Sequence, residues 1–169
     1  MKWITGVART VAAVLVTTIL ITVPAAGDVF LGVNAGRMDV GRSGAGATNL
    51  GLTLSSDLDV LHLDLGVAAE LTRTAISGET RGGDIDVDTN ALYVTVKTPG
   101  TVFVRLRGGF MNETVRVGRS SDSDSEFSWG AGLGANIGKV RVALGYTTGW
   151  GAVDYLSFGV QFLIAGARE

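Results

Sequence analysis

The chain has 169 residues, no cysteine and a formal net charge of −2, which excludes a disulfide-stapled small protein and argues against nucleic-acid binding, since that requires a basic surface. Hydrophobic residues make up 46% of it, yet no segment after the first 27 residues approaches the roughly 18 continuous apolar residues of a membrane-spanning helix. The 25 glycines disfavour long helices, because each costs about 1 kcal/mol inside one. The composition therefore favours a β-protein with unusually many apolar side chains.

The N-terminus has the three parts of a secretory signal. Lys2 and Arg9 come first, an apolar run extends from Val11 to Val23, and small residues follow at Ala25 and Gly27. The sequence predicts a signal peptide at residues 1–27 and one domain at residues 28–169, with cleavage after either Ala25 or Gly27. Its removal leaves 12 basic and 16 acidic residues, a net charge of −4.

The mature chain alternates between apolar and other residues with a period of two, most plainly from Leu61 to Leu71. Such alternation is typical of strands with one apolar and one polar face. Eight strands are predicted in chain order, with these apolar members: Val29–Ala35, Leu50–Leu54, Leu61–Leu71, Leu92–Val96, Val102–Phe110, Phe127–Ile137, Val140–Tyr146 and Leu156–Phe162.

The connections alternate in length. Tight turns are expected at Ser55–Asp57, Lys97–Gly100 and Gly138–Lys139, and longer polar loops at 38–48, 73–90, 114–125 and 148–154. Long loops at one rim, short turns at the other and an even strand number are features of outer-membrane barrels.

Two kinds of closed barrel fit this pattern. A soluble, lipocalin-like periplasmic barrel binding a small apolar ligand would place the apolar face inside, and a membrane barrel would place it outside. The other face holds both signs of charge interleaved with glycines, which suits a polar plugged interior. We predict an interior polar network of His62, Asp64, Glu70, Lys97, Arg105, Arg107, Glu113 and Arg141.

Aromatic residues favour the membrane alternative. They are expected to form a girdle near the strand ends, with four toward the long loops and two toward the other end: Phe110, Phe127, Trp129 and Tyr146, then Phe158 and Phe162.

The stretches Val102 to Phe110, Trp129 to Ile137 and Tyr155 to Phe162 carry a family resemblance. The chain resembles the small eight-stranded outer-membrane β-barrels of the OmpA-transmembrane-domain and OmpX type. The resemblance implies an all-β, antiparallel up-and-down transmembrane barrel in a Gram-negative bacterium, with porin-like architecture, and implies that the barrel-assembly machinery recognises the last strand. The family commonly ends on the aromatic residue, whereas seven residues follow Phe162 here.

Function is expected to be non-catalytic: envelope integrity or surface interaction by a monomer, without nucleic acid, cofactor or metal. Arg37, Arg73 and Arg116 are expected near the outer strand ends, where a guanidinium suits lipopolysaccharide phosphate. The acidic runs Asp84–Asp88 and Asp122–Glu126 are interpreted as solvated loops. A second alternative, a membrane-embedded lipid-modifying enzyme, would depend on His62 and Asp64, but the His-x-Ser motif of lipid A deacylases is not matched.

Overall fold

The computed structural model describes residues 27–40, 45–80, 83–149 and 153–166. In these ranges the chain forms nine strands: β1 (Asp28–Val40), β2 (Ala45–Val60), β3 (Leu63–Ile76), β4 (Gly78–Thr80), β5 (Gly83–Lys97), β6 (Val102–Val117), β7 (Ser120–Ile137), β8 (Val140–Gly149) and β9 (Val153–Ala165). Of the predicted signal peptide only Gly27 is described, so that segment stays a prediction. Within the described ranges, no helix is long and apolar enough to cross a membrane.

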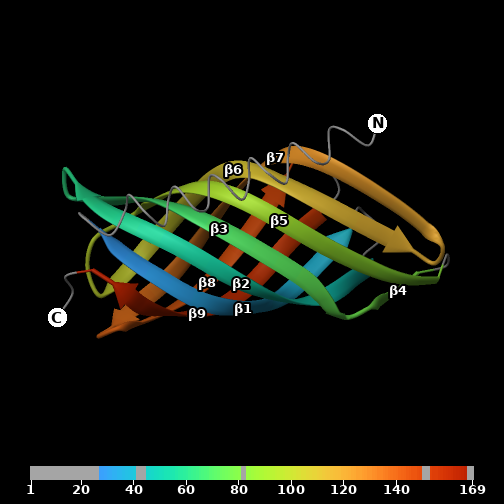
Figure 1. Cartoon of the computed structure of the whole chain (residues 1–169), viewed down its shortest axis with the longest axis horizontal. Coiled ribbons are helices and arrows are strands. Elements are labelled where there is room, and N and C mark those ends of the chain that lie inside the picture. The colour runs from blue at the N-terminus through green and yellow to red at the C-terminus, as the bar shows by residue number, and fades with distance from the viewer. Residues whose placement is uncertain (1–26, 41–44, 81–82, 150–152, 167–169) are drawn as a thin grey trace.

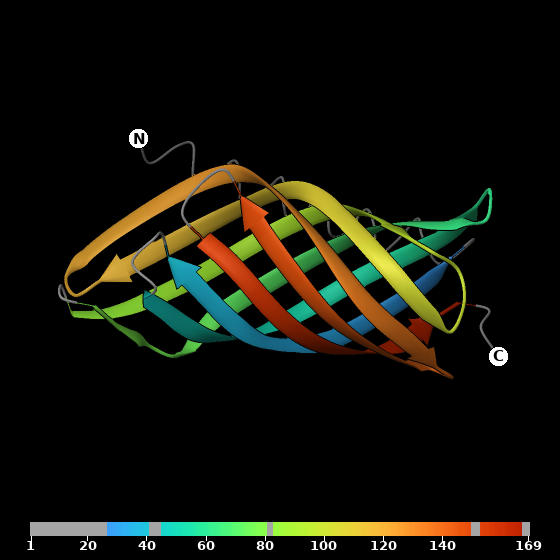
Figure 2. The same cartoon turned by 180° about the vertical axis from the view of Figure 1, so that it is seen from behind.

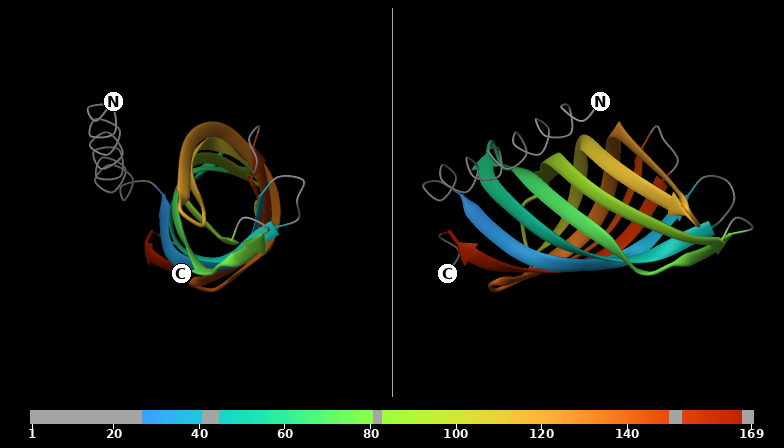
Figure 3. Two further views of the ribbon diagram at one scale, coloured as in Figure 1. Left: turned by 90° about the vertical axis from the view of Figure 1, so that its right-hand side faces the viewer. Right: turned by 45° about the vertical axis from the view of Figure 1, so that its right-hand side comes forward.

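Eight of these strands close into an antiparallel barrel (Figure 1). The sheet runs β3-β2-β1-β9-β8-β7-β6-β5, and a pairing between β3 and β5 closes it. The three-residue β4 adds only to the end of β5. Seen along its axis, the barrel is a ring of strands (Figure 3, left). The predicted eight-stranded up-and-down barrel is confirmed.

The two ends of the barrel differ. At the turn end, named here for its short connections, β2 meets β3 through Leu61–His62, β5 meets β6 through Thr98–Thr101, and β7 meets β8 through Gly138–Lys139. At the opposite, hairpin end, several strands continue as extended hairpins, of which β6–β7 is the longest (Figure 2). The first residues of β1 and the last residues of β9 also lie at the turn end.

The structure places the apolar face outside. Leucine, valine and aromatic side chains of every barrel strand are exposed, while the buried set is mostly polar or charged. This distribution is the reverse of what a soluble ligand-binding barrel requires, so the lipocalin-like alternative is wrong.

The long polar loops expected at the hairpin end are largely strands. β1 and β2 extend to Val40 and from Ala45, and β6 and β7 leave only Gly118–Arg119 between them. The turn expected at Ser55–Asp57 is also strand, because β2 continues to Val60. The reason for the error at the hairpin end is a reversal of sidedness. Beyond the apolar belt, the residues that face outward are polar and many of those that face inward are apolar, so the belt pattern does not continue.

Candidate functional site

Four ionised side chains form a cluster inside the turn end of the barrel. Asp57 on β2 is the shared acceptor, with its Oδ2 2.5 Å from Lys97 Nζ and 2.7 Å from Arg141 Nη2. Asp64 on β3 lies farther off, 3.6 Å from Lys97 Nζ. All four side chains are nearly inaccessible to solvent, so their mutual pairing offsets the desolvation each would otherwise suffer.

Aromatic rings complete this turn-end ion cluster. The guanidinium carbon of Arg141 lies 3.6 Å from the centre of the Phe30 ring, and Lys97 Nζ lies 5.3 Å from that of Phe103. Such cation–π contacts strengthen when water is excluded. The sequence reasoning missed Asp57, Phe30 and Phe103. The alternation could have identified the two phenylalanines as inward, since Phe30 and Phe103 stand two residues from the inward positions Gly32 and Arg105.

A second ionic contact lies farther along the interior. Arg107 Nη1 donates to Glu70 Oε2 at 2.9 Å, its Nε donates to Thr147 Oγ1 at 2.8 Å, and its guanidinium lies 4.5 Å from the centre of the Tyr93 ring. Arg105 extends past β7 toward β8, where a methyl group added at Gly145 would stand 3.3 Å from its Nη2. The glycine leaves room for that guanidinium.

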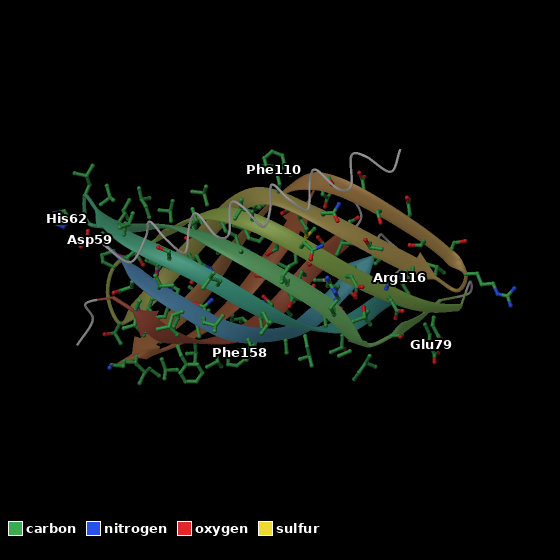
Figure 4. The ribbon with its side chains drawn as sticks, in the orientation of Figure 1. Asp59, His62, Glu79, Phe110, Arg116 and Phe158 are labelled. Carbon is green, nitrogen blue, oxygen red and sulfur yellow. The ribbon has the colours of Figure 1, made fainter. Side chains whose placement is uncertain are left out.

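The structure thus brings together most of the predicted interior network, but not His62. His62 and Leu61 form the β2–β3 turn, both with positive φ (68° and 54°), and His62 is exposed at the extreme end of the barrel (Figure 4). It was placed inside because the alternation was extended through a turn. A general base oriented by Asp64, as the enzyme alternative needs, is therefore not assembled there.

The inside of the hairpin end contains an apolar cluster. Its buried residues form a cluster, the hairpin-end apolar cluster: Met38, Ala47, Ile85, Val87, Val153 and Tyr155, with Val40, Val115 and Val117 packed against it. These side chains pack the protruding hairpins against one another.

One inward group at this end is acidic. Glu113 on β6 pairs in register with Asp124 on β7, and Asp122 and Glu126 occupy the neighbouring inward positions. Glu113 is only 6% exposed, and its Oε2 has no hydrogen-bond partner among the described residues. Burial first, and then the nearby charges of Glu126, Asp124 and Asp122, raise the pKa of Glu113 to about 7. Glu113 therefore lies inside as expected, but among carboxylates rather than cations.

The predicted girdle residues all face outward and are exposed, as Figure 4 shows for Phe110 and Phe158. Phe110 and Phe127 face each other across β6 and β7, with ring centres 5.9 Å apart in an edge-to-face arrangement. Phe162 pairs with Val140 near the turn end, whereas Phe158 pairs with Leu144, in the middle of both strands. The expectation that Phe158 lies toward the turn end is therefore wrong, because Phe158 lies midway along the barrel.

The three arginines proposed for lipid phosphate lie at two heights. Arg37 and Arg73 occupy the outward positions directly after the last apolar ones, Ala35 and Leu71. Arg116 lies six residues beyond Phe110, about 20 Å along the strand at roughly 3.3 Å per residue. Arg37 pairs with Asp39 at 2.8 Å and Arg116 with Asp88 at 3.1 Å.

The acidic runs of the hairpin end do not assemble a metal centre in the part of the chain that is described, where no three or more His, Asp or Glu side chains are grouped to hold an ion. The outward carboxylates of β5 have other partners. Asp88 accepts from the Thr74 amide at 3.1 Å, and Asp86 accepts from Ser77 Oγ at 2.6 Å. These runs are strand residues rather than the solvated loops expected.

Solved structures share this fold. The barrel matches Ail, the attachment invasion locus protein of Yersinia pestis, at 15% identity and a TM-score of 0.54, covering 80% of this chain and 96% of that one. It also matches neisserial surface protein A (13%, TM-score 0.52, 80% and 97%) and the N-terminal β-barrel domain of Pseudomonas aeruginosa OprF (14%, 0.52, 80% and 98%). Comparison of the sequence with protein-family models and with curated proteins gives no match. The chain has the fold of the small outer-membrane β-barrels.

Proposed function

We propose that the protein spans the outer membrane of a Gram-negative bacterium as a monomer and serves the envelope structurally or through surface contacts. The observation that carries this proposal is the pairing of an exposed apolar belt with an ionic interior. Exposed leucine, valine and aromatic residues such as Val104, Leu133 and Phe158 would cost solubility in water, but in lipid they are the favoured surface.

The interior side chains are proposed to plug the barrel. An eight-stranded barrel has an interior just wide enough for side chains to fill. The turn-end ion cluster and the contact of Arg107 with Glu70 join strands that are not adjacent in the barrel, so these side chains extend through the lumen. On this proposal the protein is not an open pore, and these residues support the barrel rather than a passage.

Lipopolysaccharide contact is assigned to Arg37 and Arg73, which follow the last outward apolar residues of β1 and β3. That is the height at which lipid phosphates would lie, and a planar guanidinium suits phosphate. The exposed pairing of Arg37 with Asp39 does not oppose this, because such pairs contribute little. Arg116 lies too far beyond the belt for the same role.

The role of the hairpin end is proposed to be contact with the surroundings. Its described residues include ten acidic and four basic side chains: Asp39, Glu79, Asp84, Asp86, Asp88, Glu113, Asp122, Asp124, Glu126 and Asp154 against Arg37, Arg73, Arg116 and Arg119. A structure of Ail holds the heparin analogue sucrose octasulfate. The acidic excess here opposes binding of such a polyanion and favours cationic surfaces instead.

A catalytic role is not proposed, because His62 lies in an exposed turn and Asp64 faces Lys97 inside the barrel. During biogenesis we expect the barrel-assembly machinery to engage β9, whose outward residues include Phe158 and Phe162.

The first test is gel mobility of the membrane-extracted protein with and without boiling, together with fractionation of the envelope. A heat-dependent mobility shift and recovery in the outer-membrane fraction are expected. A chain that stays soluble and monomeric without detergent would refute the proposal.

Lipid contact has its own test, binding to bilayers with and without lipopolysaccharide. Arg37→Ala with Arg73→Ala should weaken the lipopolysaccharide-dependent stabilisation severalfold. The matched control, Arg116→Ala, should leave it intact. Equal behaviour of the two variants would remove the assignment but not the membrane location.

A further inference from the structure

The inward face of the β6–β7 hairpin concentrates negative charge. Glu113 and Asp124 stand directly opposite each other, and such cross-strand pairs have Cβ atoms about 5 Å apart. Asp122 and Glu126 flank Asp124 on the same face of β7, at diagonal positions from Glu113. Like charges at these separations destabilise the pairing of two strands.

Glu113 is the member that this environment affects most. Its neighbours on the inward face of β6 are Met111 and Val115, and Thr89 stands opposite it on β5, so no cation is provided from these positions. The other titratable groups inside this part of the barrel are the phenols of Tyr93 on β5 and Tyr155 on β9, which are uncharged at neutral pH, and the buried pair of Arg107 with Glu70, whose charges offset each other. Arg116 and Asp88 lie on the outward face and pair with each other.

The two strands of the hairpin differ in their contacts with the rest of the barrel. β6 is paired with β5 from Ile85 to Lys97, and its Val115 and Val117 pack on the hairpin-end apolar cluster. Among the described residues β7 is paired with β8 only through Ser128–Ile137, and Glu126 lies against Gly149 at the end of β8, so the outermost part of β7, Ser120–Ser125, has β6 as its sole described neighbouring strand. Repulsion between Glu113 and Asp124 therefore acts on a segment that the described strands pair on one side only.

We propose that Ser120–Ser125 is a pH-dependent flap, which lies against β6 while Glu113 is protonated and loosens when Glu113 ionises. The flap would change the surface that the barrel presents outside the membrane between mildly acidic and mildly alkaline surroundings. This goes beyond the structural role proposed above and needs only the fold to be correct.

The direction follows from proton linkage. The docked hairpin holds the pKa of Glu113 at about 7 instead of 4.5, so the docked form binds this proton about 300-fold more tightly than a solvated glutamate would. Docking is therefore favoured at low pH, and this preference is lost as pH rises from about 4.5 to about 7, with little further change above that. Since one proton is involved, the ratio of loosened to docked flap rises at most about tenfold per pH unit.

A nitroxide on the flap reports this equilibrium. The chain has no cysteine, so Ser121→Cys on the outward face gives a single labelling site in the detergent-extracted barrel. In the presence of a metal chelator, the mobile component of the electron paramagnetic resonance spectrum should grow from about pH 5, with a midpoint between 4.5 and about 7, and level off above about pH 8. Absence of any transition in this range would overturn the proposal.

Variants identify the group responsible. Glu113→Gln should hold the flap docked at every pH, whereas Glu79→Gln, an exposed carboxylate on β4 at the same end, should leave the transition unchanged (Figure 4). If the transition persists in Glu113→Gln, the proposal is wrong. Should that variant fail the heat-mobility test of folding, Asp124→Asn decides, because removing the facing charge should move the midpoint to lower pH. An unmoved midpoint would again contradict the flap.

Discussion

At the scale of single residues, the interior depends on acceptors that serve more than one cation. Asp57 accepts contacts from both Lys97 and Arg141, from two different strands, while Phe30 and Phe103 cover the cations. The cluster is stable only as a whole, since removing one member leaves charges that neither water nor a partner can satisfy.

Asp57→Asn is expected to destabilise the barrel by about 3–5 kcal/mol, because it leaves two buried cations close together with only the more distant Asp64 as counter-charge. Unfolding by guanidinium chloride in detergent, followed by gel mobility, measures this. Asp59→Asn, an exposed carboxylate two residues along β2, is the matched control and should change stability by less than about 0.5 kcal/mol. Similar values for the two variants would show that the ion cluster contributes little.

Two inward glycines allow a second comparison. A methyl group at Gly109 would overlap the Leu92 carbonyl oxygen, which is fixed backbone, whereas at Gly145 it would meet only the flexible end of Arg105 at 3.3 Å. Gly109→Ala is expected to cost about 1–3 kcal/mol, and Gly145→Ala to be near neutral, in the same unfolding assay. Equal costs would mean that the backbone of β5 and β6 yields more easily than its pairing suggests.

The sequence predicted which residues face inward but not what they contact. Alternation fixes sidedness along a strand, so Glu70, Lys97, Arg107 and Arg141 could be placed inside from their positions alone. Their partners depend on register between strands distant in the chain, which alternation does not encode. Asp57 was missed because the serines before it resemble a turn.

At the scale of elements, the β2–β3 turn is unusual. Leu61 and His62 both have left-handed backbone conformations, which cost non-glycine residues about 1–2 kcal/mol each, and Leu61 is 90% exposed. The β7–β8 turn meets the same geometric demand at its first position with Gly138 (φ 58°).

Leu61→Asn combined with His62→Gly should therefore stabilise the barrel, by about 1 kcal/mol or more, because Asn-Gly is the preferred pair for a two-residue hairpin turn. The midpoint of unfolding in denaturant and the yield of refolded barrel should both rise. As the converse control, Gly138→Ala should lower both. If Asn-Gly instead destabilised the barrel, the exposed Leu61 side chain would have to make stabilising contacts with molecules other than this chain.

The hairpin end shows where an element-level prediction from sequence fails. In the hairpin end of β5, the outward residues Asp84, Asp86 and Asp88 are polar, and the inward residues Ile85 and Val87 are apolar. Farther along the same strand the outward residues are apolar instead: Leu92, Val94 and Val96. When a strand passes from lipid into water, its outward face changes from apolar to polar because it becomes solvated, and its inward face can become apolar because it packs against other strands. The reversal looks like the end of a strand and was interpreted as a loop.

At the scale of the whole molecule, the barrel is longer than its apolar belt. The outward face of β7 runs from Ser121, Ser123 and Ser125 through Phe127 and Trp129 to Leu133 and Ile137. Its polar section therefore lies beyond the girdle formed by Phe110 and Phe127, in the part of the barrel that we place outside the bilayer. A single strand thus samples water, interface and hydrocarbon in sequence, which makes the position of the membrane measurable.

Arginine placed singly along this face of β7 should report depth. Leu133→Arg is expected to cost about 2–4 kcal/mol in a bilayer and Ile137→Arg less, because the penalty falls toward the interface, while Ser123→Arg should cost close to nothing. Leu133→Ala separates loss of the leucine from addition of the charge. The measurement is reversible unfolding in lipid vesicles. A profile that peaks at Leu133 fixes the belt on the strand, whereas a penalty at Ser123 as large as that at Leu133 would mean that the hairpin end lies in lipid and that its acidic face needs another explanation.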